Sequence, residues 1–177
     1  VIIFNGSGSN AMEATVRSLV ADDETVLNVS VGAFGDLYHK MAVVNGKKAA
    51  QLKFEPGRAI DLGRLETEIK LVKPAVVTYT HNETSTGVVN DIHAISELVR
   101  AHGALPLVDG VSIFGGAAVD LKGSGIAMYA TATQKSLALP AGFGIGFVHR
   151  DAEEKAQKVT NRGHTACIIG QLGRARK

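Results

Sequence analysis

The sequence has no tryptophan, one cysteine, four prolines and only 5% aromatic residues. The single cysteine, Cys167, excludes an internal disulfide framework and is typical of a reducing compartment, so we expect a cytoplasmic protein. No apolar run approaches the roughly 20 residues that a membrane-spanning helix needs. The formal net charge is only +2, and no lysine and arginine cluster is larger than the final "RARK". The composition therefore predicts neither a membrane protein nor a nucleic-acid-binding protein.

What is present is a regular alternation of short apolar runs and segments with helical periodicity. With 177 residues, 45% of them hydrophobic, the chain can bury one sizeable core. Strands separated by helices of about a dozen residues predict a mostly parallel sheet covered on both faces, a three-layer αβα fold. The expected strands cover residues 1–4, 25–31, 50–54, 75–80, 105–109, 126–132 and 144–149, and the expected helices 10–20, 34–46, 60–71 and 91–102.

Polar and unusual residues follow the predicted strands at their carboxyl ends. In open α/β sheets, ligands bind beyond these ends, so the residues that follow each strand are the candidates for a binding site. The first candidate is "NGSGSNAMEA", residues 5–14, a glycine-containing turn into a helix for which Ser9 is the expected N-cap. Backbone N–H groups and the hydroxyls of Ser7 and Ser9 would favour a phosphate there. The plain alternative is a tight turn with a serine cap.

"GSGSNA" also satisfies the G-x-G-x-x-A pattern of dinucleotide-binding folds. Such folds carry an acid at the end of the second strand, which binds the ribose. The second predicted strand reads "VLNVSVG" and has no carboxylate. A NAD-binding oxidoreductase is therefore the weaker interpretation.

Asp109 and Lys135 are the second and third candidates. Asp109 ends the buried strand in "PLVDGVS" and, unless it is a structural cap, needs a cation such as a protonated ring nitrogen. Lys135 lies in "TATQKSLALPAG", whose small and apolar residues predict burial. A lysine in a dry site is a nucleophile that forms Schiff bases with carbonyls, although an isolated lysine is more often a surface residue. The helix start at Ser7 to Ser9, Asp109 and Lys135 would thus bind a phosphate, a ring nitrogen and an aldehyde. Pyridoxal phosphate (PLP) carries these three groups.

Two further features fit a flat, hydrogen-bonding ring. Phe34 in "GAFGDL" could stack on a ring or could belong to the core. "THNETSTGVV", residues 80–89, offers hydroxyl and amide groups or is a polar turn before a helix that begins near Asp91, and His81 within it could stack or titrate. The histidines are scattered singly and show no spacing typical of metal ligands.

Together, "NGSGSNAMEA", "GAFGDL", "THNETSTGVVND", "LVDGVSIFGG" and "ATQKSLALPAGFG" resemble the class V aminotransferases of PLP fold type I. The resemblance is nearest to the alanine–glyoxylate and serine–pyruvate branch and covers roughly residues 1 to 155 in order and spacing. It implies a ping-pong transamination between a small amino acid (alanine, serine or aspartate) and a 2-oxo acid (glyoxylate or pyruvate), in a homodimer.

Site roles follow from the same resemblance, motif by motif. Lys135 would form the Schiff base with PLP and shuttle the proton, and Asp109 would pair with the ring nitrogen. The phosphate would be bound by Ser7, Gly8 and Ser9, with Gln134 nearby. Thr84 would lie near the ring hydroxyl, and Phe34 occupies the stacking position, where relatives often carry tryptophan.

Two expectations concern the limits of this assignment. The resemblance implies that residues 1–177 are a partial large domain, with an N-terminal segment and a C-terminal small domain missing. Cysteine desulfurases share the scaffold but use a mobile cysteine and typically a histidine before the lysine, where this sequence has Gln134. A desulfurase or lyase remains the alternative reaction.

Overall fold

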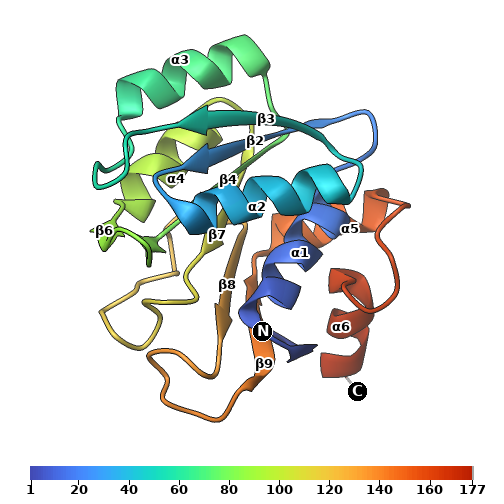
Figure 1. Ribbon diagram of the computed structural model, residues 1–177. Helices are drawn as coiled ribbons and strands as arrows, with labels where there is room; N and C mark the ends of the chain where they lie inside the picture. Colours follow the sequence, from blue (N-terminus) through green and yellow to red (C-terminus); the bar gives the residue numbers. More distant parts are fainter. Residues whose placement is uncertain (177) are drawn as a thin grey trace.

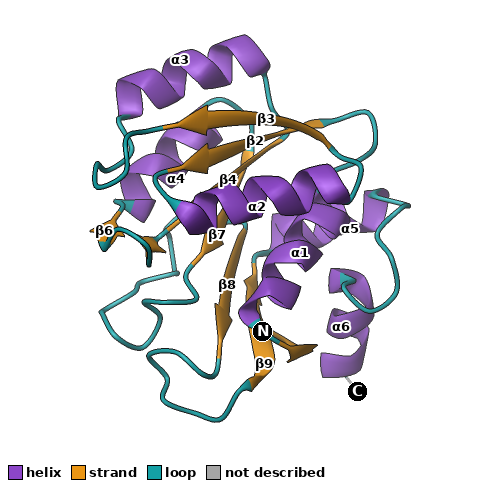
Figure 2. Cartoon of the chain, viewed as in Figure 1, coloured by secondary structure: helices purple, strands orange, loops and turns teal. Residues whose placement is uncertain are grey.

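The computed structural model describes residues 1–176 as a three-layer αβα fold around a seven-stranded sheet (Figures 1 and 2). The sheet order is β1-β9-β8-β7-β4-β2-β3, and β5 and β6 form a separate two-stranded hairpin. The strands are β1 (Ile2–Gly6), β2 (Thr25–Ser30), β3 (Lys48–Lys53), β4 (Val76–Thr80), β5 (Asn82–Glu83), β6 (Val88–Val89), β7 (Leu105–Asp109), β8 (Met128–Ala132) and β9 (Gly142–Val148). The helices are α1 (Gly8–Leu19), α2 (Ala33–Val44), α3 (Leu62–Val72), α4 (Ile92–Ala101), α5 (Arg150–Lys158) and α6 (Ile168–Ala175).

The predicted parallel sheet is confirmed, with one exception. β2, β3, β4, β7 and β8 pair in parallel, whereas β9 runs antiparallel to both of its neighbours, β8 and β1. β1 therefore points in the same direction as β8, and its carboxyl end lies at the same edge of the sheet. This direction decides which loops can form one site.

Helices cover both faces of the sheet. One core contains buried residues of α1, α2, α5 and α6, and the other contains those of α3 and α4. The central strands β4 and β8 are buried along their whole length, as their continuous apolar runs predict. Figure 1 shows α1 and α2 side by side over one face, with α3 and α4 on the other.

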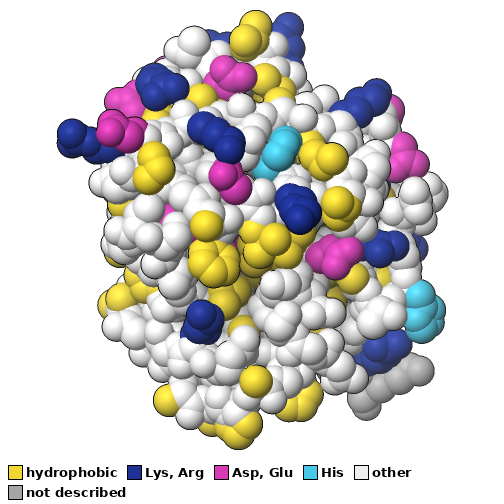
Figure 3. Space-filling view, in the orientation of Figure 1, with side chains coloured by type: hydrophobic (Ala, Val, Ile, Leu, Met, Phe, Trp, Pro, Cys, Tyr) yellow, Lys and Arg dark blue, Asp and Glu magenta, His cyan; other side chains and the backbone are white. Residues whose placement is uncertain are grey.

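The surface agrees with the balanced composition. On the face seen in Figure 3, basic and acidic side chains are interspersed and do not form a large patch of one sign. In the described part of the chain, no helix has both the length and the apolar character to cross a membrane. No cluster of three or more potential metal-ligating side chains occurs there either.

Candidate active site at the carboxyl edge of the sheet

Five segments that follow strands β1, β2, β4, β7 and β8 meet at one edge of the sheet. The segment after β7 contacts the segment after β8 through Ser136, whose hydroxyl donates to the Ser112 carbonyl oxygen at 2.9 Å. The segment after β7 also contacts the β5–β6 hairpin, because Asn82 Nδ2 of the hairpin donates to Ser112 Oγ at 2.9 Å. The hairpin in turn caps α2, and the start of α1 packs against Val111. The segments that carry the predicted site residues are thus held together by direct contacts.

The N-terminus of α1 is the predicted phosphate-binding end. The helix begins at Gly8 with Ser7 as its N-cap, so the expectation that Ser9 is the cap is wrong. The reason is Asn10, whose side-chain Oδ1 accepts hydrogen bonds from Ser7 N at 3.0 Å and Ser7 Oγ at 3.2 Å. Within residues 1–176, the N–H groups of Gly8 and Ser9 have no acceptor, which leaves the positive end of the helix ready for an anion.

Gly8 is required by close packing. A Cβ atom at this position would lie 2.5 Å from Val111 Cγ2 and 3.2 Å from Ala132 Cβ. These are branched or backbone-bound atoms that cannot move aside easily. The absence of a side chain therefore lets α1 approach the loop that follows Asp109.

Asp109 is a buried carboxylate with one hydrogen bond. It is 4% exposed, and its Oδ1 accepts from Val111 N at 2.9 Å. Burial raises the pKa of Asp109 to about 6; the Val111 N–H and the Lys135 cation lower this pKa, and the Glu83 carboxylate raises it. No ion pair with Asp109 exists among residues 1–176. Its one hydrogen bond caps the loop after β7, as the structural alternative predicts, and the carboxylate is left without a cation in this part of the chain.

Lys135 is exposed, so its predicted burial is wrong. The chain leaves the sheet after Ala132 and forms a loop in which Thr133 Oγ1 donates to the Pro140 carbonyl oxygen at 2.7 Å. The apolar residue Leu139 is 54% exposed in the same loop. The ammonium forms no ion pair in the described chain, but its charge is close enough to lower the pKa of Asp109.

Unpartnered buried polar atoms indicate that this edge is built for a ligand. In the described residues, three buried side-chain atoms have no hydrogen-bond partner: Thr80 Oγ1, Thr86 Oγ1 and Gln134 Oε1. Thr80 ends β4 and is the direct cross-strand neighbour of Asp109, so the two side chains lie on one face of the sheet. Gln134 precedes Lys135. Polar groups of this kind are costly to leave unpaired, and a polar ligand would satisfy those at the site.

Phe34 and Thr84 lie at the border of this site. Phe34 is the second residue of α2 and is half-buried. Thr84 is exposed in the turn between β5 and β6. This polar turn closes the β5–β6 hairpin, and α4 begins after it with Asp91 as its N-cap, as expected.

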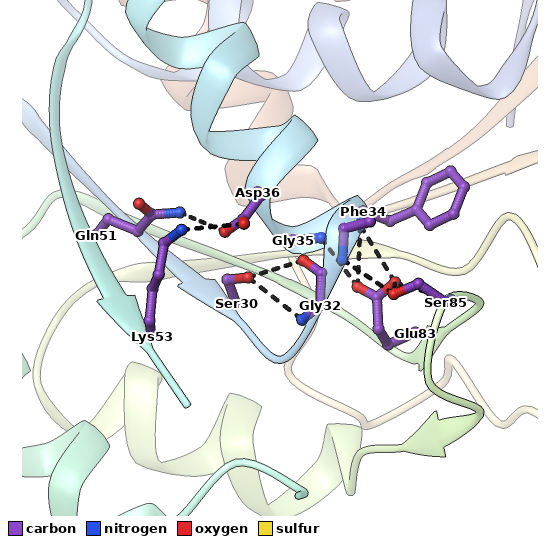
Figure 4. A network of polar contacts seen from close by, with 10 residues as sticks. Ser30, Gly32, Phe34, Gly35, Asp36, Gln51, Lys53, Glu83 and Ser85 are labelled. Carbon is purple, nitrogen blue, oxygen red and sulfur yellow. Dashed lines mark hydrogen bonds and ion pairs between the residues drawn. The ribbon is translucent and has the colours of Figure 1, made fainter. Parts of the chain in front are cut away.

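The structure adds Glu83, to which the sequence interpretation assigned no role. Glu83 is fully buried, and its carboxylate accepts hydrogen bonds from the first turn of α2 (Figure 4). The one local signal is Gly32, an N-cap residue without a side chain, which indicates that the cap comes from elsewhere.

Two other candidates lie outside the site. His81 points to the α3 and α4 side of the sheet, where its Nδ1 lies 2.9 Å from the Tyr129 hydroxyl. Burial lowers the pKa of its ring.

Cys167 is buried at the N-cap of α6, where its Sγ accepts from Gly170 N. The next residue, Ile168, donates its N–H to Ser18 near the far end of α1, about three turns from Gly8. Cys167 is therefore not positioned as a catalytic cysteine of the desulfurase kind.

Comparison with known proteins agrees with this geometry. The family model for aminotransferase class V matches residues 1–171. The chain is 34% identical to the (S)-ureidoglycine–glyoxylate transaminase of Bacillus subtilis, over 90% of this chain and 39% of the relative. It is 32% identical to the pyridoxamine–pyruvate transaminase of Mesorhizobium japonicum, over 95% of this chain and 44% of the relative.

Solved structures show the same fold. The structure superposes on the alanine–glyoxylate aminotransferase of a Nostoc species with a TM-score of 0.88 and 30% identity, covering 99% of this chain and 46% of that one. The chain thus spans less than half the length of these relatives. Because the family model matches nearly all of the sequence, the chain belongs to the class V aminotransferase family.

Proposed function

We propose that the full-length protein transfers an amino group from a small amino acid to a 2-oxo acid by a ping-pong mechanism. The cofactor is PLP, which accepts electrons from the carbon next to the substrate amine while its ring nitrogen stays protonated. The printed names of several relatives contain glyoxylate or pyruvate, which supports these two as acceptors. We infer alanine, serine or aspartate as the donor.

The candidate residues at this edge of the sheet are of the types that bind PLP, and each of them has a role in the proposal. Ser7, Gly8 and Ser9 bind the phosphate at the N-terminus of α1, with Gln134 nearby. Asp109 pairs with the ring nitrogen, and Thr84 binds the ring hydroxyl. Phe34 packs on the ring, and this hydrophobic contact excludes water from one side of the site.

Lys135 is the reactive group in the proposal. Its Nζ would hold PLP through the aldehyde carbon. As a free amine, once a donor amine has taken its place, it would carry the proton from the substrate α-carbon to that cofactor carbon. Asp109 supports this by holding the proton on the ring nitrogen. One observation carries the assignment. Within residues 1–176, a buried carboxylate without a cation lies at the same sheet edge as a lysine without an ion pair and a helix N-terminus without acceptors.

The test is a transamination screen of the full-length protein with PLP. Alanine, serine and aspartate are each combined with glyoxylate and pyruvate, and the new amino acid is measured. Activity with at least one pair is expected. If the PLP-loaded protein aminates neither acceptor, or instead releases sulfide from added cysteine, the proposal is wrong.

We also infer that the full-length protein is a homodimer in the cytoplasm. The exposure of Lys135, Thr84 and Ser9 supports the first point, because an aminotransferase site has to be shielded from water. The single cysteine supports the second. Light scattering of the full-length protein tests the dimer, and a monomer at micromolar concentration would contradict it.

A further inference from the structure

We infer that Glu83 is a positioning residue, which joins the β5–β6 hairpin to the N-terminus of α2 and thereby holds the ring of Phe34 against the cofactor. The inference rests on the proposed PLP site. It goes further because it assigns a role to a residue that does not touch the cofactor in that proposal.

The contacts of Glu83 come from two segments about 50 positions apart in the sequence. In α2, Phe34 N lies 3.2 Å from both carboxylate oxygens and Gly35 N lies 3.0 Å from Oε2. Within the hairpin, Ser85 donates to Oε1 from its backbone N at 3.1 Å and from Oγ at 2.7 Å. Figure 4 shows these bonds converging on one side chain, with the ring of Phe34 pointing away from it.

Glu83 and Ser85 together satisfy the whole first turn of α2. Ala33 N donates to Ser85 Oγ at 3.0 Å, so each of the first three N–H groups of the helix has an acceptor in the hairpin. The N-cap residue Gly32 has no side chain that could do this. A Cβ atom there would lie 2.5 Å from Ser85 Oγ and 2.6 Å from Glu83 Cγ, so the glycine makes room for the distant cap.

A buried charge needs compensation, and here the helix provides it. Glu83 is 0% exposed and has no ion pair in the part of the chain that the structure describes. The aligned N–H groups and the positive end of the α2 dipole stabilise the carboxylate. A neutral side chain of the same shape would lose most of this attraction, so the identity of Glu83 fixes the position of the first turn of α2.

The same hairpin is anchored to the Asp109 segment. His81 N donates to the Asp109 carbonyl oxygen at 2.7 Å, and Asn82 bonds to Ser112. The negative charge of Glu83 also raises the pKa of Asp109. Glu83 therefore links the element that carries Phe34 to the element that carries Asp109.

A double-mutant cycle in the full-length protein tests this role through the affinity for PLP, measured from its absorbance. Glu83→Gln is expected to weaken PLP binding about tenfold in the wild-type background, and less than about threefold in a Phe34→Ala background, because the effect acts through Phe34. Glu97→Gln, the same change at an exposed position of α4, should alter neither value. An equal loss in both backgrounds, or no loss in the wild-type background, would overturn the inference.

Amide hydrogen exchange gives a second readout that does not depend on the cofactor. In the cofactor-free protein, Glu83→Gln should speed exchange at Phe34 and Gly35 and leave α4 unchanged. Ser85→Ala leaves the Glu83 carboxylate in place and should speed exchange at Ala33. This variant replaces Glu83→Gln in the test if Glu83→Gln does not fold. Unchanged exchange at the start of α2 would contradict the inference, whereas failure of the wild-type protein to bind PLP would contradict the proposed function.

Discussion

Asp109 is kept ionised in a place where burial opposes its charge. Its pKa is about 6 in the folded protein, against 3.8 in an exposed chain. The folded state therefore binds a proton more tightly than the unfolded state, and the contribution of Asp109 to stability falls as the pH rises from about 4 through 6. Such a cost at a strand end is typical of a functional residue.

Asp109→Asn should therefore separate stability from binding. At pH 8 the cofactor-free variant is expected to be more stable to urea by on the order of 1–3 kcal/mol, and this gain should vanish near pH 4. PLP affinity at pH 8 should fall at least about tenfold, because the proposed partner of the ring nitrogen is lost.

Asp120→Asn is the matched control for this prediction. Asp120 Oδ1 accepts from the N–H two residues on at 2.9 Å, as Asp109 Oδ1 does, but Asp120 is exposed. It should change neither stability nor affinity by a measurable amount. A less stable Asp109→Asn variant at pH 8 would contradict the account of its pKa.

Lys135 is expected to be essential for turnover and not for folding. Lys135→Ala should lower the transamination rate by roughly 10³-fold or more, because the substitution removes the proposed nucleophile and proton carrier. Its melting temperature should stay within about 2 °C of the wild type, since the side chain is exposed and forms no ion pair within residues 1–176. Lys122→Ala, at another exposed position, provides the control, and normal transamination by Lys135→Ala would disprove the assignment.

At the scale of elements, the start of α1 depends on Gly8. Gly8→Ala should destabilise the protein by roughly 1–3 kcal/mol and weaken PLP binding, because the new methyl group would press against Val111. Gly63→Ala in α3 is the comparison, since the nearest atom to its added Cβ lies at 3.5 Å. That change should be neutral or slightly stabilising. Urea unfolding of both variants measures the difference, and equal effects would contradict the packing argument.

Local sequence predicted the seven strands of the main sheet, the helices α1 to α4 and the start of α4 at Asp91, but not α5, α6 or the N-caps of α1 and α2. Helical periodicity placed α1 correctly, yet Ser7 and not Ser9 is the N-cap, because Asn10 bonds back to Ser7. The cap of α2 could not be predicted, since Glu83 lies about 50 residues away and no local rule connects the two. The β5–β6 hairpin was missed because each of its strands has only two residues, too few to show alternation.

At the scale of the whole molecule, the grouping of the candidate residues was predictable because the topology is regular. Parallel strands have their carboxyl ends at one edge of the sheet, so residues 7–9, 109 and 134–135 could be grouped from sequence alone. The antiparallel direction of β9 left no mark in its apolar run. The exposure of Lys135 was also missed, because burial of a loop depends on what packs over it.

The assignment of Lys135 as the residue that binds PLP can be tested directly by trapping the bond between protein and cofactor. The full-length protein is loaded with PLP, reduced with borohydride, digested and mapped by mass spectrometry. We expect the visible absorbance of the bound cofactor to be lost and one pyridoxyl adduct to be found, on Lys135. An adduct on any other lysine, or none on a protein that binds PLP, would contradict it.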